Sequence, residues 1–164
     1  MSISLREVAD RIAITDVLVR YCRHLDEMSL EGIPDLFTPD CVVSYGPDPL
    51  LESHGAAALA RSLQRLWRWS RTSHHLSNVD IRLIDDAHAR VSSYVIAWHE
   101  RPDGSTATLF GSYDDDFVRQ GERWLVARRR QEMHGCDAGF RVNLHRLVRR
   151  PPPPGWEPPQ IDGR

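Results

Sequence analysis

The chain of 164 residues has no long hydrophobic run, no excess of basic residues and only 3 cysteines. No apolar segment approaches the ~20 residues that span a bilayer, and the first residues lack the apolar core of a signal peptide. Lys and Arg total 21 against 23 Asp and Glu, a net charge of −2, whereas nucleic-acid-binding proteins usually carry a basic excess. The odd number and wide spacing of Cys22, Cys41 and Cys136 indicate reduced thiols. We therefore expect a cytoplasmic protein that binds neither nucleic acid nor membranes.

Sequence motifs for cofactors and metal ions are also missing. Gly46, Gly55 and Gly104 stand alone, so none of them belongs to a glycine-rich phosphate-binding loop. The histidines do not form the HExxH spacing of a zinc-binding helix, and no cysteine pair supplements them. We expect no cofactor and no metal ion.

The periodicity of the apolar residues changes from helical to strand-like along the chain. Ser4 and Glu7 form a capping-box pattern, after which helical spacing predicts one long helix to about Leu25. The predicted elements after it are helices over 29–37 and 54–69 and strands over 41–45, 73–84, 89–100, 106–119 and 123–133. The long strands follow one another through turns, which predicts an antiparallel arrangement.

This order of elements predicts an α+β fold. We expect a cone-shaped, curved antiparallel sheet covered by three N-terminal helices, with an open end where a small ligand can be enclosed. Residues 1–148 are expected to form this single domain. The proline-rich residues 149–164 are expected to form an extended C-terminal tail.

A carboxylate and a histidine pair on different predicted elements are the most informative chemical feature. Asp26 follows the first helix, and His74 and His75 lie in a predicted strand. An imidazole held at one ring nitrogen by a carboxylate can take a proton at the other, as a general base does. Alternation places the two histidines on opposite faces of the strand without saying which face meets the cavity. The alternatives are a structural histidine with one hydrogen bond and an aspartate in solvent.

Three segments, in this order, resemble the SnoaL-like family of the nuclear transport factor 2 superfold. They are AITDVLVRYCRHLDEMSLEGIPDLFTPDCVV, TSHHLSNVDI and GSYDDDFVRQGERWLVARR. By element order and periodicity the resemblance covers roughly residues 4 to 145. Members with lyase activity include scytalone dehydratase, hexachlorocyclohexane dehydrochlorinase and bile acid 7α-dehydratase, which share an Asp–His dyad deep in the cone.

The resemblance implies roles for particular residues. Asp26 and His74 match the dyad, and Tyr21 and Arg129 match further catalytic residues of individual members. The sequence leaves open whether Arg129 lies on a solvated basic edge or points inward, where it would need an anionic partner from the protein or the ligand. At Leu25 the chain departs from scytalone dehydratase, which has a second tyrosine there.

Four further residues are predicted to bind the substrate. Tyr45 and His99 resemble an additional tyrosine and histidine of scytalone dehydratase, and Trp98 and Phe110 are large aromatic residues of the predicted strands. For the two aromatic residues the alternative is a place in the core or in a dimer interface.

The leading functional hypothesis is a cofactor-independent lyase of the dehydratase type. Its substrate would be a small hydrophobic cyclic molecule of the steroid or polyketide kind, and the enzyme would be a homodimer or a higher homo-oligomer. One alternative is an isomerase or cyclase with the same dyad. Another is a non-catalytic ligand-binding or structural subunit, because a fold alone does not determine function.

Overall fold

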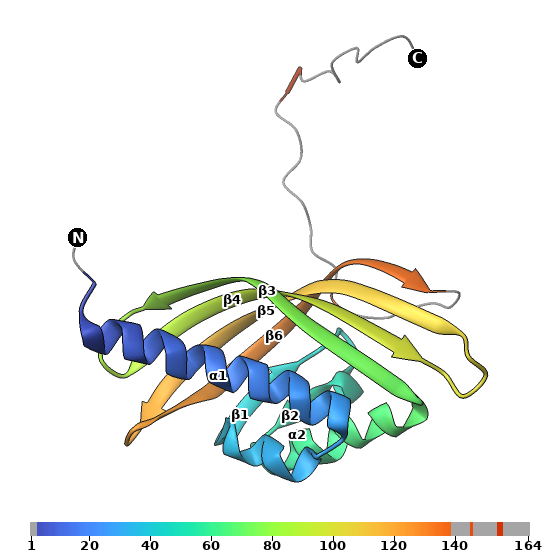
Figure 1. Cartoon of the computed structure of the whole chain (residues 1–164), viewed down its shortest axis with the longest axis horizontal. Coiled ribbons are helices and arrows are strands. Elements are labelled where there is room, and N and C mark those ends of the chain that lie inside the picture. Colours follow the sequence, from blue (N-terminus) through green and yellow to red (C-terminus); the bar gives the residue numbers. More distant parts are fainter. Residues whose placement is uncertain (1–2, 139–144, 146–153, 156–164) are drawn as a thin grey trace.

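The structure, a computed structural model, describes residues 3–138, 145 and 154–155 (Figure 1). The elements follow in the order α1 (Leu5–Glu27), 3-10 helix η1 (Leu30–Asp35), β1 (Phe37–Ser44), η2 (Pro49–Leu51), β2 (Glu52–His54), α2 (Ala56–Leu63), η3 (Gln64–Arg68), β3 (Arg71–Leu83), β4 (His88–Glu100), β5 (Thr106–Gln120) and β6 (Arg123–Ala138). The predicted tail at 149–164 lies almost entirely outside the described residues, so the domain boundary stays a prediction.

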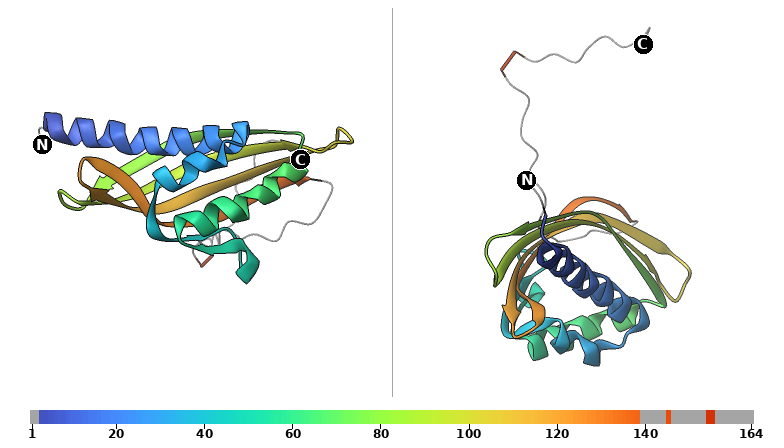
Figure 2. Two further views of the ribbon diagram at one scale, coloured as in Figure 1. Left: turned by 90° about the horizontal axis from the view of Figure 1, so that it is seen from below. Right: turned by 60° about the vertical axis from the view of Figure 1, so that its left-hand side comes forward.

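The strands form one curved sheet of 6 strands in the order β2-β1-β6-β5-β4-β3. Figure 2 shows α1 lying along the hollow side of this sheet, with α2 beyond it. The predicted α+β class and the antiparallel run from β3 to β6 are confirmed. The sheet is mixed, however, because β1 pairs with β6 in parallel. That pairing joins strands at opposite ends of the chain, and a local sequence pattern does not encode it.

The helices keep their predicted places, but α1 continues two residues beyond the predicted end and the other two differ in extent. The segment after α1 forms only the 3-10 helix η1, because Pro34 and Gly32, which both disfavour an α-helix, lie within it. The third predicted helix is divided into α2 and η3. Within the described residues, no helix combines the length and the hydrophobicity that a membrane span requires.

Helix α1 begins at the predicted capping box. The Glu7 N–H donates to Ser4 Oγ at 3.1 Å, and the Ser4 N–H donates to Glu7 Oε2 at 2.7 Å. The buried face of the helix carries Ile14, Leu18 and Tyr21, and this face brings the last turn of α1 against the sheet. Leu5, Val8 and Ile12 follow the same helical spacing in the sequence, but they are exposed.

Two register shifts bend the long β5–β6 ribbon. One lies between Phe110 and Gly111, and the other lies between Asp116 and Phe117. A β-bulge of this kind increases local twist and bends a strand. At Gly111 a Cβ atom would lie 2.5 Å from the Glu132 carbonyl oxygen, so glycine allows the two backbones to approach. The bends help to close the sheet around the space beneath it.

The outer face of the sheet carries exposed aromatic and branched side chains. Tyr94 is 46% exposed and Ile96 and Phe110 are each 42% exposed, and Ile96 lies opposite Phe110 in the β4–β5 register. Exposed apolar patches of this kind often mark interfaces. We propose that this face is the interface of a homodimer packed through its sheets.

Ile96→Glu should therefore convert the dimer to a monomer, because it places a charge in an apolar interface. Light scattering at micromolar concentration should give wild-type protein at about twice the chain mass of 18.8 kDa. The control is Ile84→Glu, which changes an isoleucine that is 51% exposed and lies just past the end of β3. A wild-type mass near 18.8 kDa would contradict the dimer.

Candidate active site

A cavity of about 140 Å³ lies under the concave face of the sheet. Side chains from α1, η3 and strands β3 to β6 line it. Much of the wall is apolar, from Leu25, Leu51, Leu63, Leu66, Ala97, Ala107 and Leu109. The polar lining consists of Tyr21, Tyr45, Arg65, Arg68, Trp69, His74, His99, Tyr113 and Gln131. An apolar wall with a few converging polar groups is typical of a ligand site.

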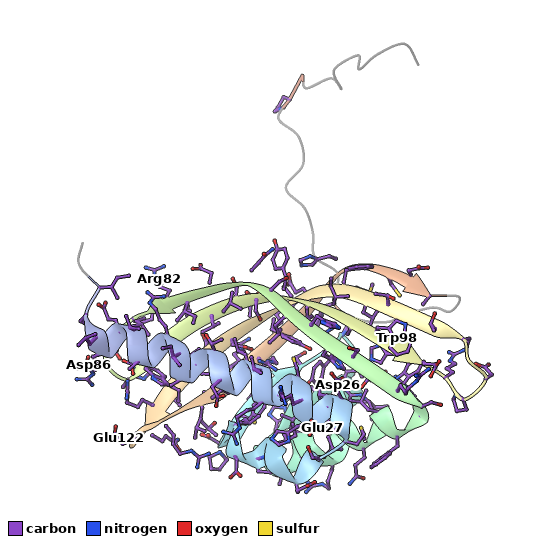
Figure 3. The ribbon with its side chains drawn as sticks, viewed as in Figure 1. Asp26, Glu27, Arg82, Asp86, Trp98 and Glu122 are labelled. Atoms are coloured by element: carbon purple, nitrogen blue, oxygen red, sulfur yellow. The ribbon has the colours of Figure 1, made fainter. Side chains whose placement is uncertain are left out.

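Asp26 is hydrogen-bonded to His74, which lines this cavity. His74 Nδ1 lies 2.6 Å from Asp26 Oδ1, and the His74 backbone N–H donates to Asp26 Oδ2 at 2.9 Å. The Thr72 hydroxyl also donates to Oδ1, at 2.9 Å. Figure 3 shows Asp26 at the C-terminal end of α1, beneath the sheet. The predicted pair is therefore formed, and three hydrogen bonds hold its carboxylate.

The charge state of Asp26 fixes the proton on the histidine ring. Burial raises the pKa of Asp26, but the hydrogen bonds from His74 and Thr72 outweigh it, so the pKa lies below its ordinary value. An ionised carboxylate accepts hydrogen bonds only, so Nδ1 of His74 must carry the proton. Nε2 is then the free ring nitrogen, on a side chain that lines the cavity and is only 5% exposed. This is the arrangement of an oriented general base.

Strand register decides which histidine faces inward. His74 pairs with Ala97 of β4, and both residues line the cavity. His75 pairs with Ile96, which is exposed on the outer face, and its ring bonds the Ser73 hydroxyl at 2.9 Å. The structure therefore places His74 in the cavity and His75 outside it.

Tyr21 and Tyr45 form a hydroxyl pair in the cavity wall. Their hydroxyl oxygens are hydrogen-bonded to each other. Burial raises the pKa of both tyrosines above the ordinary value, so both stay protonated at neutral pH. In such a pair one hydroxyl donates to the other, and the accepting hydroxyl keeps its own proton free for a ligand oxygen. The two predicted tyrosines can thus act together to donate one hydrogen bond to a ligand.

Arg129 is buried behind this pair and is not among the residues that line the cavity. Its guanidinium donates to both carboxylate oxygens of Asp115, each at 2.7 Å. Its Cζ also lies 4.3 Å from the ring centroids of Tyr21 and Tyr113. Although burial opposes the charge, the Asp115 carboxylate raises the pKa of Arg129 well above its ordinary value. The anionic partner of the inward Arg129 is therefore Asp115, a residue of the protein, and the guanidinium packs against the Tyr21 ring. The catalytic role that the resemblance implies for Arg129 stays a prediction.

His99 lines the cavity beside His74. The two rings meet edge to face with centroids 5.5 Å apart, and the centroids of the Trp69 and His99 rings are 4.9 Å apart. Burial, together with the charge of His74, lowers the pKa of His99 to about 4, so the ring is neutral at neutral pH. Within the described residues, its buried Nδ1 has no hydrogen-bond partner. A ligand can supply that missing bond.

Trp98 and Phe110 do not line the cavity, which corrects their predicted role. Trp98 pairs with Ser73 across β3–β4, and the Arg71 guanidinium carbon lies 5.8 Å from its ring. Phe110 is on the exposed outer face described above. Because side chains alternate along a strand, the neighbours of an inward residue point outward, and Trp98 precedes inward His99.

Some cavity residues had no sequence prediction. Trp69, Arg65 and Arg68 come from the η3 region, and Gln131 comes from β6. The places of Trp69, Arg65 and Arg68 depend on how η3 packs against the sheet, which is not visible in the local sequence pattern. Within the part of the chain that the structure describes, no group of 3 or more metal-ligating side chains is found.

Residues 6–130 match the family model of the SnoaL-like domain. A curated relative, an uncharacterised protein of Mycobacterium tuberculosis, is 28% identical over 131 residues, which are 77% of this chain and 87% of that protein. Among solved structures, a Novosphingobium aromaticivorans protein provisionally named a scytalone dehydratase is 28% identical, with a TM-score of 0.80 over 89% of this chain and 98% of its own. A hexachlorocyclohexane dehydrochlorinase is 16% identical, with a TM-score of 0.74 over 93% and 99% of the two chains, and so shares the fold.

Proposed function

This chain belongs to the SnoaL-like domain family, as its segments predicted, and we propose that it is a cofactor-independent lyase of the dehydratase type. The observation that carries the proposal is the 2.6 Å contact between Asp26 and the ring of His74, which lines the cavity beneath the sheet. The scytalone dehydratase name of the 28% identical relative supports the reaction class.

In the proposed reaction, His74 Nε2 takes an acidic proton from a carbon beside a carbonyl group. The electron pair of that C–H bond forms the new double bond, and the β hydroxyl leaves with its own electron pair. The proton on His74 then passes to the departing hydroxide, so that the products are an unsaturated ketone and water. A positioned base contributes about 10²–10⁴-fold to the rate.

The tyrosine pair complements the base. As the proton leaves the carbon, negative charge develops on the carbonyl oxygen. A hydroxyl of the Tyr21–Tyr45 pair would donate to that oxygen, in a wall largely closed to water. Donors already fixed in place stabilise developing charge without reorganisation. Asp26 would hold the imidazolium that forms on His74.

The volume of the cavity limits the size of the substrate that it can hold. A volume of about 140 Å³ is small beside the 300–1,000 Å³ of typical ligand sites. At about 10–15 Å³ for each water-sized position, it holds roughly ten non-hydrogen atoms. We therefore propose a monocyclic substrate in place of the larger steroid or polyketide skeleton.

The test is a screen of monocyclic β-hydroxy ketones, followed by absorbance of the conjugated enone. Mass spectrometry should show loss of one water, and His74→Ala should be inactive on the same compound. A product of unchanged mass would instead assign an isomerase or cyclase, which could use the same dyad. Saturable binding in the cavity without turnover would assign a non-catalytic binding module.

A further inference from the structure

Two arginines from η3, Arg65 and Arg68, line the cavity. The Arg65 guanidinium carbon lies 5.0 Å from the ring centroid of Tyr45, and Nη1 donates to the Ser62 carbonyl at 3.1 Å. The Arg68 guanidinium carbon lies 5.2 Å from the ring centroid of Trp69. These ring contacts hold both cations beside the polar wall that contains the tyrosine pair and His99.

Neither arginine has a counter-ion within the described residues. No carboxylate oxygen lies within 4.0 Å of Arg65 or Arg68, whereas many other arginines of this chain form such pairs. The nearby buried carboxylates are already engaged, since Asp26 accepts three hydrogen bonds and Asp115 pairs with Arg129. The part of the cavity lining formed by Arg65 and Arg68 therefore carries positive charge without a protein counter-ion among the described residues.

The electrostatic surroundings of Arg68 support this reading. Burial lowers the pKa of Arg68, and the like charges of Arg65 and Arg101 lower it further. The charge of Arg68 also acts on His99, whose pKa it lowers. Its field thus reaches the ligand-facing part of the cavity. An anion placed there would be attracted by several cations at once.

We propose that Arg65 and Arg68 bind a carboxylate group of the substrate, so that this site takes a small monocyclic carboxylic acid. The guanidinium fork matches the two oxygens of a carboxylate, and the leucines of the wall take the ring. The anchored carboxylate would leave the opposite side of the ring facing His74. The chemical step rests on the proposed lyase function, whereas the binding step does not.

The experiment measures binding of benzoate and of benzamide, a neutral compound of the same shape, by calorimetry. Benzoate should bind at least about tenfold more tightly, because charge-assisted hydrogen bonds are stronger than neutral ones. This preference should decline as salt is added. Arg65→Met and Arg68→Met keep much of the side-chain length without the charge, and each should remove most of the preference.

The matched control is Arg82→Met. Arg82 is exposed on β3, has no ion pair within the described residues, and lies near the N-terminal end of α1 (Figure 3). Its replacement should leave benzoate affinity unchanged. Equal binding of the two compounds, absence of binding by both, or tighter binding of inorganic phosphate than of benzoate would each overturn the inference.

Failure of this inference can be separated from failure of the proposed function. Benzoate preference in Asp26→Asn protein would support the arginine site even if no lyase substrate is found. Conversely, the protein could dehydrate neutral ketones and yet show no preference for benzoate. That result would support the proposed lyase function and reject the carboxylate site.

Discussion

His74→Ala is expected to lower turnover of the true substrate by about 10²–10⁴-fold or more, because the general base is lost. Asp26→Asn should cause a loss of similar size. The carboxylate of Asp26 now faces hydrogen-bond donors only, from Thr72 and from the ring and backbone of His74. The backbone N–H can only donate, so the amide should keep its oxygen there and turn its NH₂ toward the ring Nδ1 and the Thr72 hydroxyl, which can both accept. The histidine then favours the tautomer with its proton on Nε2, where the base is needed.

The control for this prediction is His75→Ala, which removes the neighbouring outward-facing ring and should change turnover little. Steady-state kinetics should show the loss chiefly in kcat, and circular dichroism should show that each variant is folded. Near-normal turnover by His74→Ala, with a large loss in His99→Ala or His75→Ala, would assign the base to another histidine.

Breaking the buried Arg129–Asp115 pair should lower the free energy of unfolding by about 3–5 kcal/mol, because it leaves a charge buried without a partner. Arg129→Met and Asp115→Leu each do this. The double variant should lose much less than the sum of the two, since apolar side chains can replace a buried pair. Urea unfolding at one fixed protein concentration measures all three free energies.

Arg130→Met provides the comparison on the same strand. Arg130 points outward and pairs with Glu132 at 3.2 Å on the surface, so its loss should cost less than about 1 kcal/mol. Similar losses for Arg129→Met and Arg130→Met would contradict the structural role assigned to the buried pair.

The elements of the fold were predictable because their signals are local. The capping box marked the start of α1, and strand periodicity marked the meander from β3 to β6. The parallel contact of β1 with β6 was not predictable in this way, since it joins residues far apart in sequence. The same reason applies to Arg65 and Arg68, whose place in the cavity depends on where η3 packs.

Strand register determines which aspartate pairs with the buried Arg129. The turn pairs Gln120 with Arg123, and regular pairing from there would set Asp114 opposite Arg129. The register shift between Asp116 and Phe117 moves the pairing by one residue, so Asp115 lies opposite Arg129 instead. The sequence left the anionic partner of an inward Arg129 open, and the bulge selects Asp115 from the run Asp114–Asp116.

The hydrogen bonds of Asp26 have a second consequence, because β3 is an edge strand of the sheet. Its free side would offer unpaired backbone groups to any other extended chain. On this side, Asp26 of α1 accepts a hydrogen bond from the His74 backbone N–H. Arg11 of the same helix donates a hydrogen bond to the Ile81 carbonyl oxygen at 2.6 Å. Helix α1 thus protects the edge against strand addition. The carboxylate that orients the proposed base also guards the protein against aggregation, so selection for solubility and for chemistry would act on the same residue.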